Sequence, residues 1–399
     1  MTFTSSKANS TEANKTGIGW RLPEITILTV HPHGDARVYT RQALSLAKVA
    51  QTVRLISPQE PGYTPPQSDG VEHYFVKRVR FRFEKFLVTP WRLLFAGLKR
   101  PASIICIHDA ILLYLFPILR LFGKICIYDR HEDYNKVVRS RYWIPKPFRI
   151  LAGNALYVFE RFFGSFASGV ISVVHPLEKI VPNCPSVVLH NFPGEQLIES
   201  GKTATTPPSK REYDVVHIGS MTDSRFGVYR AVLEGLVKRR PGFKALMIVT
   251  SERHYKILVD QFDEKQVTVL RRIPHPEVTA KLAQCKLGIA IFPTLEAHLQ
   301  WAVPVKLFEY MACGCAFVTS HMPGFESLLR EEDKKDVHIV NSADPEPYIR
   351  EIDAMLNNPA EMDCQGVMYQ KWVAEYYNWR HEEEKLYRFF TELTKKSKS

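Results

Sequence analysis

Short apolar runs alternate with helical patterns along the first half of the chain. Each run has the length and the β-branched content of a buried strand. The predicted strands are 25–30, 53–56, 103–107, 125–128, 170–174 and 187–189, and the predicted helices between them include 40–50, 110–121 and 148–166. Strands that alternate with helices predict a doubly wound parallel sheet, so the fold class is α/β.

A polar, proline-bearing segment then interrupts the alternation. Residues 193–212 are rich in Thr, Ser and Pro, which is typical of a linker. After it the pattern resumes, with strands predicted at 214–218, 245–249, 267–270, 287–292, 316–319 and 337–340. The chain therefore predicts two α/β domains, 21–192 and 213–370, with a cleft between them where a ligand usually binds.

The two ends of the chain do not fit either domain. Residues 1–20 are polar and lack an apolar signal core, so we expect a disordered tail. Residues 371–399 continue an amphipathic pattern that predicts a C-terminal helix.

The stretch that bears most on function runs from Pro304 to Gly314. Pro304 suits the first turn of a helix, and Gly314 suits the left-handed position at its end. Lys306 and Glu309 are three residues apart and share one helix face. A buried strand, 315–319, and a Pro-Gly turn follow. A helix that begins beside the carboxyl end of a strand is a common place for phosphates and sugars.

This stretch resembles the donor-site signature of GT-B glycosyltransferases of the family 4 (group 1) kind. The resembling elements are Pro-x-Lys-Leu-Phe-Glu-Tyr-Met-Ala-Cys-Gly, which begins at Pro304, and Ser-x-x-Pro-Gly-x-Glu, which ends at Glu326. The resemblance implies a GT-B fold, in which two Rossmann-like doubly wound domains face each other across a cleft. It also implies that the C-terminal helix, 371–399, packs back on the N-terminal domain, with an ordinary surface helix as the alternative. It also implies a nucleotide diphosphate sugar as donor on the C-terminal domain and retention of anomeric configuration. A surface helix with a Lys306–Glu309 ion pair is the alternative.

Three residues near the first strand of the second domain are expected at the donor diphosphate. The resemblance assigns the loop at Gly219 and Ser220 to the diphosphate, together with Arg225, whose guanidinium suits phosphate oxygens. Ser220 stands where the family usually has a basic residue. Lys306 is expected to supply part of the missing charge.

The same resemblance assigns the helix residues Leu307 and Glu309 to the nucleotide. Glu309 is expected to accept hydrogen bonds from the ribose hydroxyls. The family's partner glutamate, eight residues earlier, is Trp301 in this chain, and Glu296 is out of register. Backbone amides of 297–303 are expected to carry part of its work, and the identity of the sugar stays open.

The predicted acceptor side lies at strand ends of the first domain. The segment from His31 to Val38 and the segment Tyr-Asp-x-His-Glu, which ends at Glu132, are similar to those of one group 1 subset. His108, His131 and Glu132 are the predicted catalytic residues: the histidines would position an acceptor hydroxyl and Glu132, or the adjacent Asp133, would accept its proton. A purely structural role is the alternative for both histidines.

Two oppositely charged residues follow the first strand. Asp35 and Arg37 are expected to pair with each other and fix the turn, with a hydrogen bond to the acceptor as the alternative. The chain has no Asp-x-Asp, so neither a metal nor another cofactor is expected.

The positive charge of the chain is concentrated in one window. Residues 77–149 hold sixteen Lys and Arg against five Asp and Glu, which equals the whole net charge of +11. Aromatic residues are interleaved with them. A basic, aromatic surface favours an anionic membrane over nucleic acid, because no nucleic-acid motif accompanies the charge. A solvated face over an ordinary core is the alternative.

The cellular setting follows from the cysteines and the apolar runs. Seven scattered cysteines without metal-ligand spacing favour a reducing, cytoplasmic setting. The longest apolar run, 110–119, is about half the length of a membrane span and contains Pro117. We therefore expect a protein that is peripheral on the cytoplasmic face of a membrane.

Together these features predict a glycosyltransferase in cell-surface polysaccharide biosynthesis. Its acceptor would be a lipid-linked or membrane-proximal glycan. A sugar-nucleotide epimerase of GT-B fold and an inactive glycosyltransferase-like assembly partner are the alternatives, and the Trp301 and Ser220 departures favour the second of them.

Overall fold

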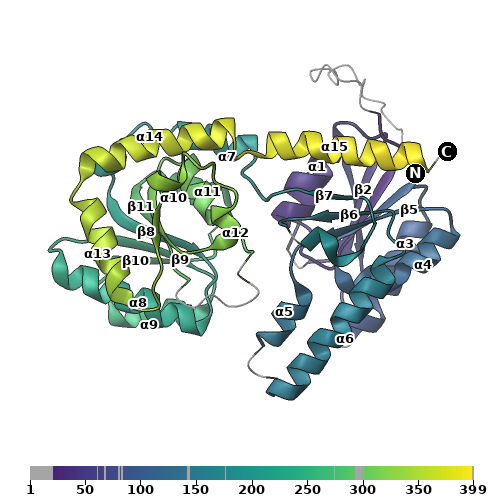
Figure 1. The fold of residues 1–399 in the computed structure, drawn as a ribbon, viewed down its shortest axis with the longest axis horizontal. Helices are drawn as coiled ribbons and strands as arrows, with labels where there is room; N and C mark the ends of the chain where they lie inside the picture. Colours follow the sequence, from purple (N-terminus) through teal and green to yellow (C-terminus); the bar gives the residue numbers. More distant parts are fainter. Residues whose placement is uncertain are drawn as a thin grey trace, which may run out of the picture.

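The structure is a computed structural model of the chain. It describes residues 21–60, 62–66, 69–79, 81, 84–141, 144–175, 177–273, 275–292, 299 and 301–397. The predicted tail, 1–20, and Glu296 lie outside the described residues, as do 297, 298 and 300 of the loop expected to contact the donor. The described parts form two α/β domains that lie side by side (Figure 1).

The N-terminal domain is built on a parallel sheet of seven strands, in the order β3-β2-β1-β4-β5-β6-β7. The strands are β1 (Ile25–Leu28), β2 (Val53–Pro58), β3 (Val71–Val76), β4 (Ile104–Ile107), β5 (Ile125–Arg130), β6 (Gly169–Ser172) and β7 (Ser186–Val188). Strand β3 is not among the predicted strands. It lies at the sheet edge and is only partly buried, so its sequence lacks the continuous apolar run that marks the central strands.

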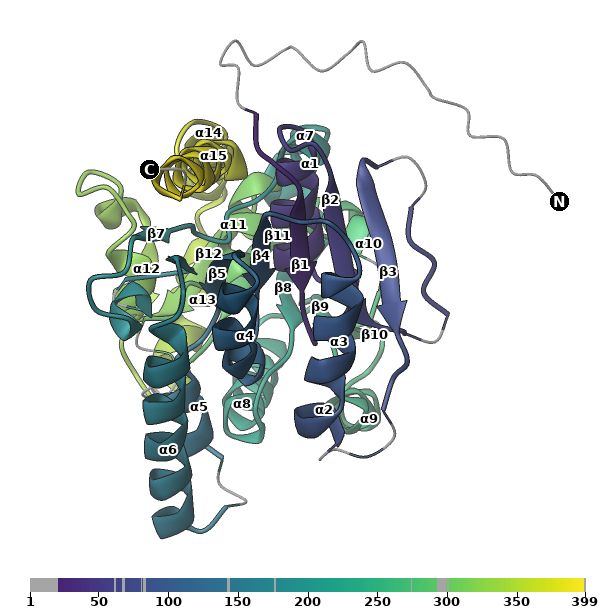
Figure 2. The same cartoon turned by 90° about the vertical axis from the view of Figure 1, so that its right-hand side faces the viewer.

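Helices cover both faces of this sheet. They are η1 (Ala36–Ala43), α1 (Leu44–Ala47), α2 (Glu84–Leu87), α3 (Thr89–Leu98), η2 (Ala110–Leu115), α4 (Phe116–Leu121), α5 (Tyr134–Arg139), α6 (Lys146–Gly164) and η3 (Leu177–Ile180). Figure 2 shows α2, α3, α4 and α6 along one face of the domain, with the long α6 extending beyond its body. No helix in the described part of the chain has the length and hydropathy needed to cross a membrane.

The C-terminal domain repeats the plan with six parallel strands, in the order β10-β9-β8-β11-β12-β13. The strands are β8 (Tyr213–Gly219), β9 (Ala245–Val249), β10 (Val267–Arg271), β11 (Cys285–Ala290), β12 (Ala316–Ser320) and β13 (His338–Val340). The helices are α8 (Asp223–Arg239), α9 (Glu252–Gln261), α10 (His275–Leu282), α11 (Val305–Ala312), α12 (Pro323–Glu326), η5 (Lys334–Asp336), α13 (Pro345–Leu356) and α14 (Pro359–Glu375). Two doubly wound parallel sheets are thus observed, and the predicted fold class is confirmed.

The segment predicted as a linker has structure of its own. It contains α7 (Glu195–Lys202) and the short turn η4 (Pro208–Lys210), and both pack on the C-terminal domain. A Cβ on Gly201 would lie only 2.0 Å from the carbonyl oxygen of Ala312, so α7 approaches the backbone of α11 where only glycine fits. The polar composition hides this packing because α7 buries little more than Ile198 and Gly201.

The predicted C-terminal amphipathic segment forms the end of α14 and a separate helix, α15 (Trp379–Lys396). Helix α14 lies on the C-terminal domain, and α15 crosses to the N-terminal domain (Figure 1). There the indole N–H of Trp379 donates to Ser45 Oγ at 2.8 Å, and the Tyr387 hydroxyl donates to the Ser45 carbonyl at 2.9 Å. Leu386 and Phe390 join the core beneath the sheet. Helix α15 thus links the two domains.

In each sheet the strand order reverses beside the first strand. Strands β1 and β4 are neighbours, with Ile25 opposite Ile104, and β8 and β11 are neighbours in the second sheet. Ligands of doubly wound folds bind outside the carboxyl ends of strands at such reversals. Of the predicted site residues, His108 directly follows β4, and Gly219 and Ser220 stand at the end of β8.

Candidate active site

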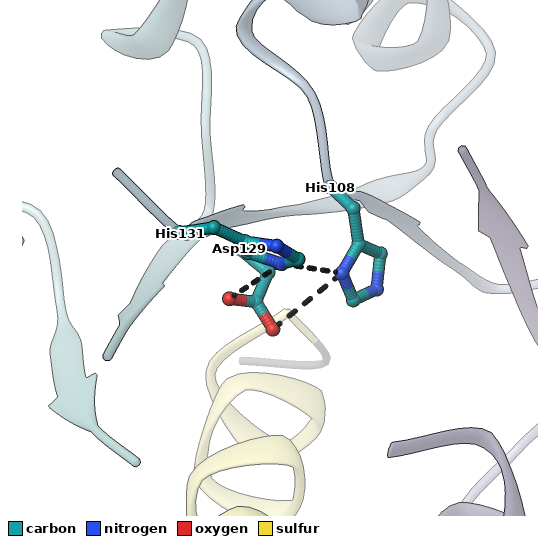
Figure 3. Close-up of side chains that lie close together, drawn as sticks. All are labelled: His108, Asp129 and His131. Atoms are coloured by element: carbon teal, nitrogen blue, oxygen red, sulfur yellow. Dashed lines mark hydrogen bonds and ion pairs between the residues drawn. The ribbon is translucent and has the colours of Figure 1, made fainter. Parts of the chain in front are cut away.

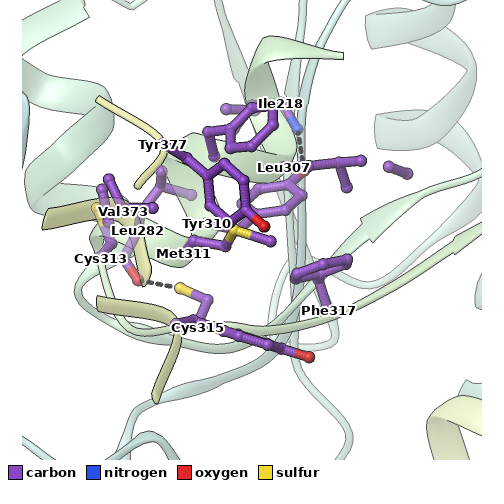
Figure 4. Packing of buried hydrophobic residues seen from close by; sticks show 14 of the residues in the cluster. Ile218, Leu282, Leu307, Tyr310, Met311, Cys313, Cys315, Phe317, Val373 and Tyr377 are labelled. Carbon is purple, nitrogen blue, oxygen red and sulfur yellow. Dashed lines mark hydrogen bonds between the residues drawn. The ribbon is translucent and has the colours of Figure 1, made fainter. Parts of the chain in front are cut away.

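Helix α11 is fixed against the second sheet by Tyr310. The Tyr310 ring packs on Gly288 so closely that a Cβ there would lie 2.2 Å from the ring. The Tyr310 hydroxyl accepts from the Ile218 N–H and donates to the Ile289 carbonyl, both at 3.3 Å. Figure 4 shows this buried cluster under α11, including Met311. The helix therefore presents its opposite face, with Lys306 and Glu309, at a fixed position relative to the ends of β8 and β11.

That face borders a cavity of about 470 Å³ in the C-terminal domain. Five of the six predicted nucleotide-binding residues line it: Gly219, Ser220, Arg225, Lys306 and Glu309. The sixth, Leu307, is fully buried and packs in the core under α11, so its side chain stabilises the helix and does not face the cavity. Consecutive residues of a helix point in different directions. Leu307 directly follows Lys306 in the sequence, so its side chain does not share the face of Lys306 and Glu309.

Two cations meet where β8 ends. Gly219 has φ +102°, a conformation that favours glycine, and a Cβ there would lie 3.6 Å from Lys306 Nζ. Arg225 lies over the Phe292 ring at 5.0 Å, and its Nε donates to Thr222 Oγ1 at 3.2 Å. Burial and, to a smaller extent, Arg225 lower the pKa of Lys306 to about 7, although Glu309 raises it. The positive charge of Arg225 and Lys306 at this end of β8 suits the binding of an anion such as a diphosphate.

Sequence reasoning did not identify Arg272, which also lines this cavity. It follows β10 directly, has φ +49°, and donates from Nε to the Thr250 carbonyl at 3.2 Å. The signal that could have found it is its position, because a basic residue directly after a strand lies at the carboxyl edge of the sheet.

A second cavity, of about 190 Å³, lies between the domains. His131 and Glu132 line it from the N-terminal domain, and Trp301 lines it from the C-terminal domain. It shares Leu299, Ala302 and Val303 with the cavity of the C-terminal domain, which we call the donor cavity after its predicted ligand. One loop therefore forms a wall of both cavities. The predicted acceptor residues and the predicted donor residues therefore lie on two sides of the same loop.

The second signature element supports this loop. A Cβ on Gly324 would lie 2.5 Å from the carbonyl carbon of Trp301, so the Pro-Gly turn lies directly against the Trp301 backbone. Glu326 accepts the Met322 N–H at 2.7 Å and lies 2.8 Å from His321 Nδ1, which closes the turn. The element is therefore structural, and it holds Trp301 in the cleft.

The predicted histidines meet in a buried cluster at the ends of β4 and β5 (Figure 3). His108 Nδ1 and His131 Nε2 lie 2.9 Å apart, so one nitrogen donates and the other accepts. Their distances to the Asp129 carboxylate are 3.7 and 3.4 Å. Burial lowers the pKa of both histidines, although Asp129 raises it, so both rings are neutral near pH 7. His108 is fully buried, which places it behind His131 and out of direct reach of an acceptor.

Asp129 is the residue that organises this cluster, and the sequence analysis did not select it. Arg37 donates to both of its oxygens, at 3.3 and 3.2 Å, and Gln42 donates at 2.9 Å. Burial alone would raise the pKa of Asp129, but Arg37, His131 and His108 outweigh burial and hold that pKa below its usual value. The sequence signal lay in the Tyr-Asp-x-His-Glu segment, which contains Asp129. Of the two carboxylates in that segment, the structure buries that of Asp129 and leaves that of Glu132 exposed.

The predicted pairing of Asp35 with the Arg37 side chain is wrong. Asp35 instead caps η1, and its carboxylate accepts the N–H groups of Arg37 and Val38 at 2.8 and 3.1 Å. Arg37 also donates to the Leu189 carbonyl at 2.7 Å. The buried Arg37 guanidinium has lost its water and needs several hydrogen-bond acceptors, which the Asp129 carboxylate and the Leu189 carbonyl provide. The Asp35 carboxylate is already used by backbone N–H groups.

Within the described residues, the ligand atoms of His108, Asp129 and His131 lie within 4.8 Å of one another and are the one group with the composition of a metal site. The Arg37 guanidinium already binds both carboxylate oxygens, and a divalent cation beside it would be repelled. The cluster therefore suits orientation of the neutral His131 ring better than it suits a metal.

Comparisons with known proteins agree with this geometry. Residues 227–387 match the family described as Glycosyl transferase-like. The chain is similar in structure to sucrose-phosphate synthase from Thermosynechococcus elongatus, with a TM-score of 0.71, 17% identity, and coverage of 94% of this chain and 99% of that one. No curated protein matches the sequence.

Two further solved structures show the same fold. A glycosyltransferase from Rickettsia africae has a TM-score of 0.68 and 12% identity, and the match covers 94% of this chain and 99% of that one. HepE of Anabaena in complex with UDP-glucose has a TM-score of 0.66 and 12% identity, over 92% of this chain and 99% of that one. The identification made from the signature is thereby confirmed: the chain has the GT-B glycosyltransferase fold, and residues 227–387 are glycosyl transferase-like in sequence.

Proposed function

We propose that this protein transfers a sugar from a nucleotide diphosphate sugar to a lipid-linked or membrane-proximal glycan. The observation that carries the proposal is the pair of cavities on either side of one loop. The donor cavity holds Arg225, Lys306 and Glu309, and the interdomain cavity holds His131 and Glu132. HepE binds UDP-glucose in its solved structure, which supports a nucleotide sugar as the donor of a related fold.

In the proposed reaction the bond between the sugar C1 and the diphosphate oxygen breaks. The negative charge that develops on the leaving diphosphate faces Arg225 and Lys306, which stabilise it more strongly than they stabilise the bound donor. The acceptor oxygen forms the new bond to C1, and its proton passes to the Glu132 carboxylate. His131, held by His108 and Asp129, orients the sugar or the acceptor hydroxyl. Retention of configuration rests on the resemblance, and the anomeric configuration of the product, measured by NMR, tests it.

A thermal-shift screen with UDP-, GDP- and ADP-sugars tests the donor site, because a ligand that binds only the folded state raises the melting temperature. The nucleotide sugar that raises the melting temperature is then used as the donor in a turnover assay. Arg225→Ala and Glu309→Ala should abolish turnover and leave the melting temperature of the free protein unchanged. Arg230→Ala is the matched control, since Arg230 lies on the same helix and outside the cavity. Full activity in either site variant would refute the assignment, and donor consumption without acceptor would favour an epimerase.

The membrane part of the proposal is supported by an exposed apolar surface on the N-terminal domain. Of the large apolar side chains that the structure describes as exposed, all except Val259, Val367 and Tyr376 lie between Phe75 and Phe166. They come mainly from α2, α3, α4 and α6 and include Phe86, Leu87, Trp91, Phe95, Leu121, Phe122, Phe148, Leu151, Val158 and Phe162. Exposed apolar side chains gathered on neighbouring helices in this way mark an interaction site, and the Lys and Arg of the same segment match an anionic bilayer.

Co-sedimentation with lipid vesicles tests this surface. A Leu151→Ser and Phe162→Ser double variant should lose binding to anionic vesicles, because both side chains are more than half exposed and contribute apolar area to α6. Val367→Ser, at an exposed apolar position on α14, is the matched control. Equal binding of the double variant and the control would refute membrane association. The free cysteines of the described chain agree with the proposed place of action, the cytoplasmic face of the membrane. A role in cell-surface polysaccharide biosynthesis is part of the same proposal.

A further inference from the structure

An apolar pocket opens within the exposed apolar surface. It has a volume of about 560 Å³ and lies between α2, η2, the start of α5 and α6. Its lining is almost entirely hydrocarbon and ring: Phe86, Leu87, Ala110, Ile111, Tyr114, Tyr134, Leu156 and Phe159, with Asp109 as the one charged residue. Phe86 and Leu87 are 58% and 66% exposed, so the pocket is continuous with the surface proposed to meet the membrane.

A polar cavity of about 310 Å³ adjoins it on the other side of α2. Lys85, on the same short helix as Phe86 and Leu87, lines this second cavity together with Arg78. Glu60 is the acidic residue in its lining, so the two cations are in excess. Helix α2 therefore separates a hydrocarbon-lined space from a cationic one.

The two cavities meet at the contact between His31 and Asp109, which lies beside the histidine cluster. Asp109 lines the apolar pocket, His31 lines the polar cavity, and His31 Nε2 lies 3.2 Å from Asp109 Oδ1. The His31 ring stacks on His131, with centroids 5.3 Å apart and planes 11° apart. Asp109 is itself fixed by the Thr29 hydroxyl and the Val30 N–H, at 3.1 and 2.8 Å. A ligand spanning both cavities would therefore lie beside His31, which stacks on His131 of the histidine cluster.

We propose that the apolar pocket binds the hydrocarbon chain of the acceptor lipid and that Lys85 and Arg78 bind its phosphate. This inference rests on the proposed function and names its substrate class: an amphipathic phosphate ester whose chain leaves the bilayer and enters the protein. The occupant follows from the match between the two cavities and the two parts of such a lipid. A detergent-like neutral chain would use only the apolar pocket, and a soluble sugar phosphate would use only the cationic one.

Isothermal titration with butyl, octyl and dodecyl phosphate, each below its micelle concentration, tests the proposal in the absence of any sugar donor. Affinity should rise with chain length until the pocket is full, by up to about fourfold per added methylene. Leu156→Trp, which fills the pocket, should abolish the dependence on chain length. Val158→Trp, on the exposed side of the same helix, is the matched control and should bind the series as the wild type does. Lys85→Ala should weaken all three ligands by a similar factor.

Two results would overturn the pocket assignment. One is an affinity that does not depend on chain length in the wild-type protein. The other is an equal loss in Leu156→Trp and Val158→Trp, which would indicate adsorption to the outer surface. A second pocket variant, Ile111→Phe on η2, guards against a folding defect in Leu156→Trp, and thermal unfolding of both is measured. A different result would contradict the proposed transferase activity: no nucleotide sugar would bind in the thermal-shift screen. That screen is independent of the titration with alkyl phosphates.

Discussion

Lys306 gives the donor site a specific pH dependence. Burial and the neighbouring Arg225 lower the pKa of Lys306 to about 7, against a usual value of 10.5. A bound diphosphate adds negative charge next to the ammonium group and raises that pKa, so binding is coupled to the uptake of a proton. The protonated fraction of the free site falls from about nine-tenths at pH 6 to about one-tenth at pH 8. The affinity for a nucleotide diphosphate sugar should therefore fall about tenfold between these values.

The affinity falls as the pH rises because the protonated form of Lys306 is the form that binds the diphosphate. Affinity is full below the pKa of the free lysine and is lost as the pH rises through about 7. The assay is isothermal titration with the preferred nucleotide sugar across this range, in buffers of different ionisation enthalpy, which also counts the protons taken up. The two phosphates of the sugar diphosphate do not titrate there, and the pKa of His217 lies well below it because of burial and Lys306.

Two variants isolate the lysine. Lys306→Arg keeps its charge at all these pH values and should bind with a flat profile. Arg225→Ala removes the cation that lowers the pKa of Lys306, so the fall in affinity should move to higher pH, at a lower overall affinity. A flat profile in the wild-type protein, or an unchanged tenfold fall in Lys306→Arg, would refute the reasoning.

Three further predictions concern stability and the position of the loop. Asp129→Asn leaves the buried Arg37 guanidinium without its counter-ion and should lower the free energy of unfolding in urea by about 3–5 kcal/mol; a loss below about 1 kcal/mol would contradict the role given to the pair. Gly324→Ala should displace the Trp301 backbone and reduce turnover, with a stability loss of about 1–3 kcal/mol; normal turnover would show that the contact is not needed. Trp379→Ala should cost about 3–5 kcal/mol by loosening α15 from the N-terminal domain, and hydrogen exchange of α15 would show where the protection is lost.

The elements that the sequence predicted well are those buried on both sides. Central strands such as β9 (Ala245–Val249) read as continuous apolar runs, since parallel strands are covered by helices on both faces. Gly314, predicted as left-handed, has φ +63°. Edge and surface elements were harder: β3 is half exposed, and α7 lies in a segment whose composition is that of a linker. Their identity depends on contacts with distant residues, which no local pattern contains.

The candidate site divides in the same way. Residues on one short helix, such as Lys306 and Glu309, were predicted to share a face and do line one cavity, because helical spacing fixes that relation locally. The partner of Arg37 is 92 residues away, and the nearer Asp35 was chosen in its place. Pairings between strand ends depend on the order of strands in the sheet. The strand order depends on how the whole chain folds, so it cannot be predicted from any short segment of the sequence.

The two signature elements act on the same loop, and this explains how Trp301 is accommodated. The first element fixes α11, and with it the residues that face the donor cavity. The second element places Gly324 against the Trp301 backbone and so sets the wall between donor and acceptor. A tryptophan in place of a glutamate removes two hydrogen-bond acceptors from this wall and adds a large apolar ring. The wall thereby loses acceptors for sugar hydroxyls and gains a surface suited to stacking on a sugar ring, while Arg225 and Lys306, which the signature assigns to the diphosphate, line the neighbouring cavity.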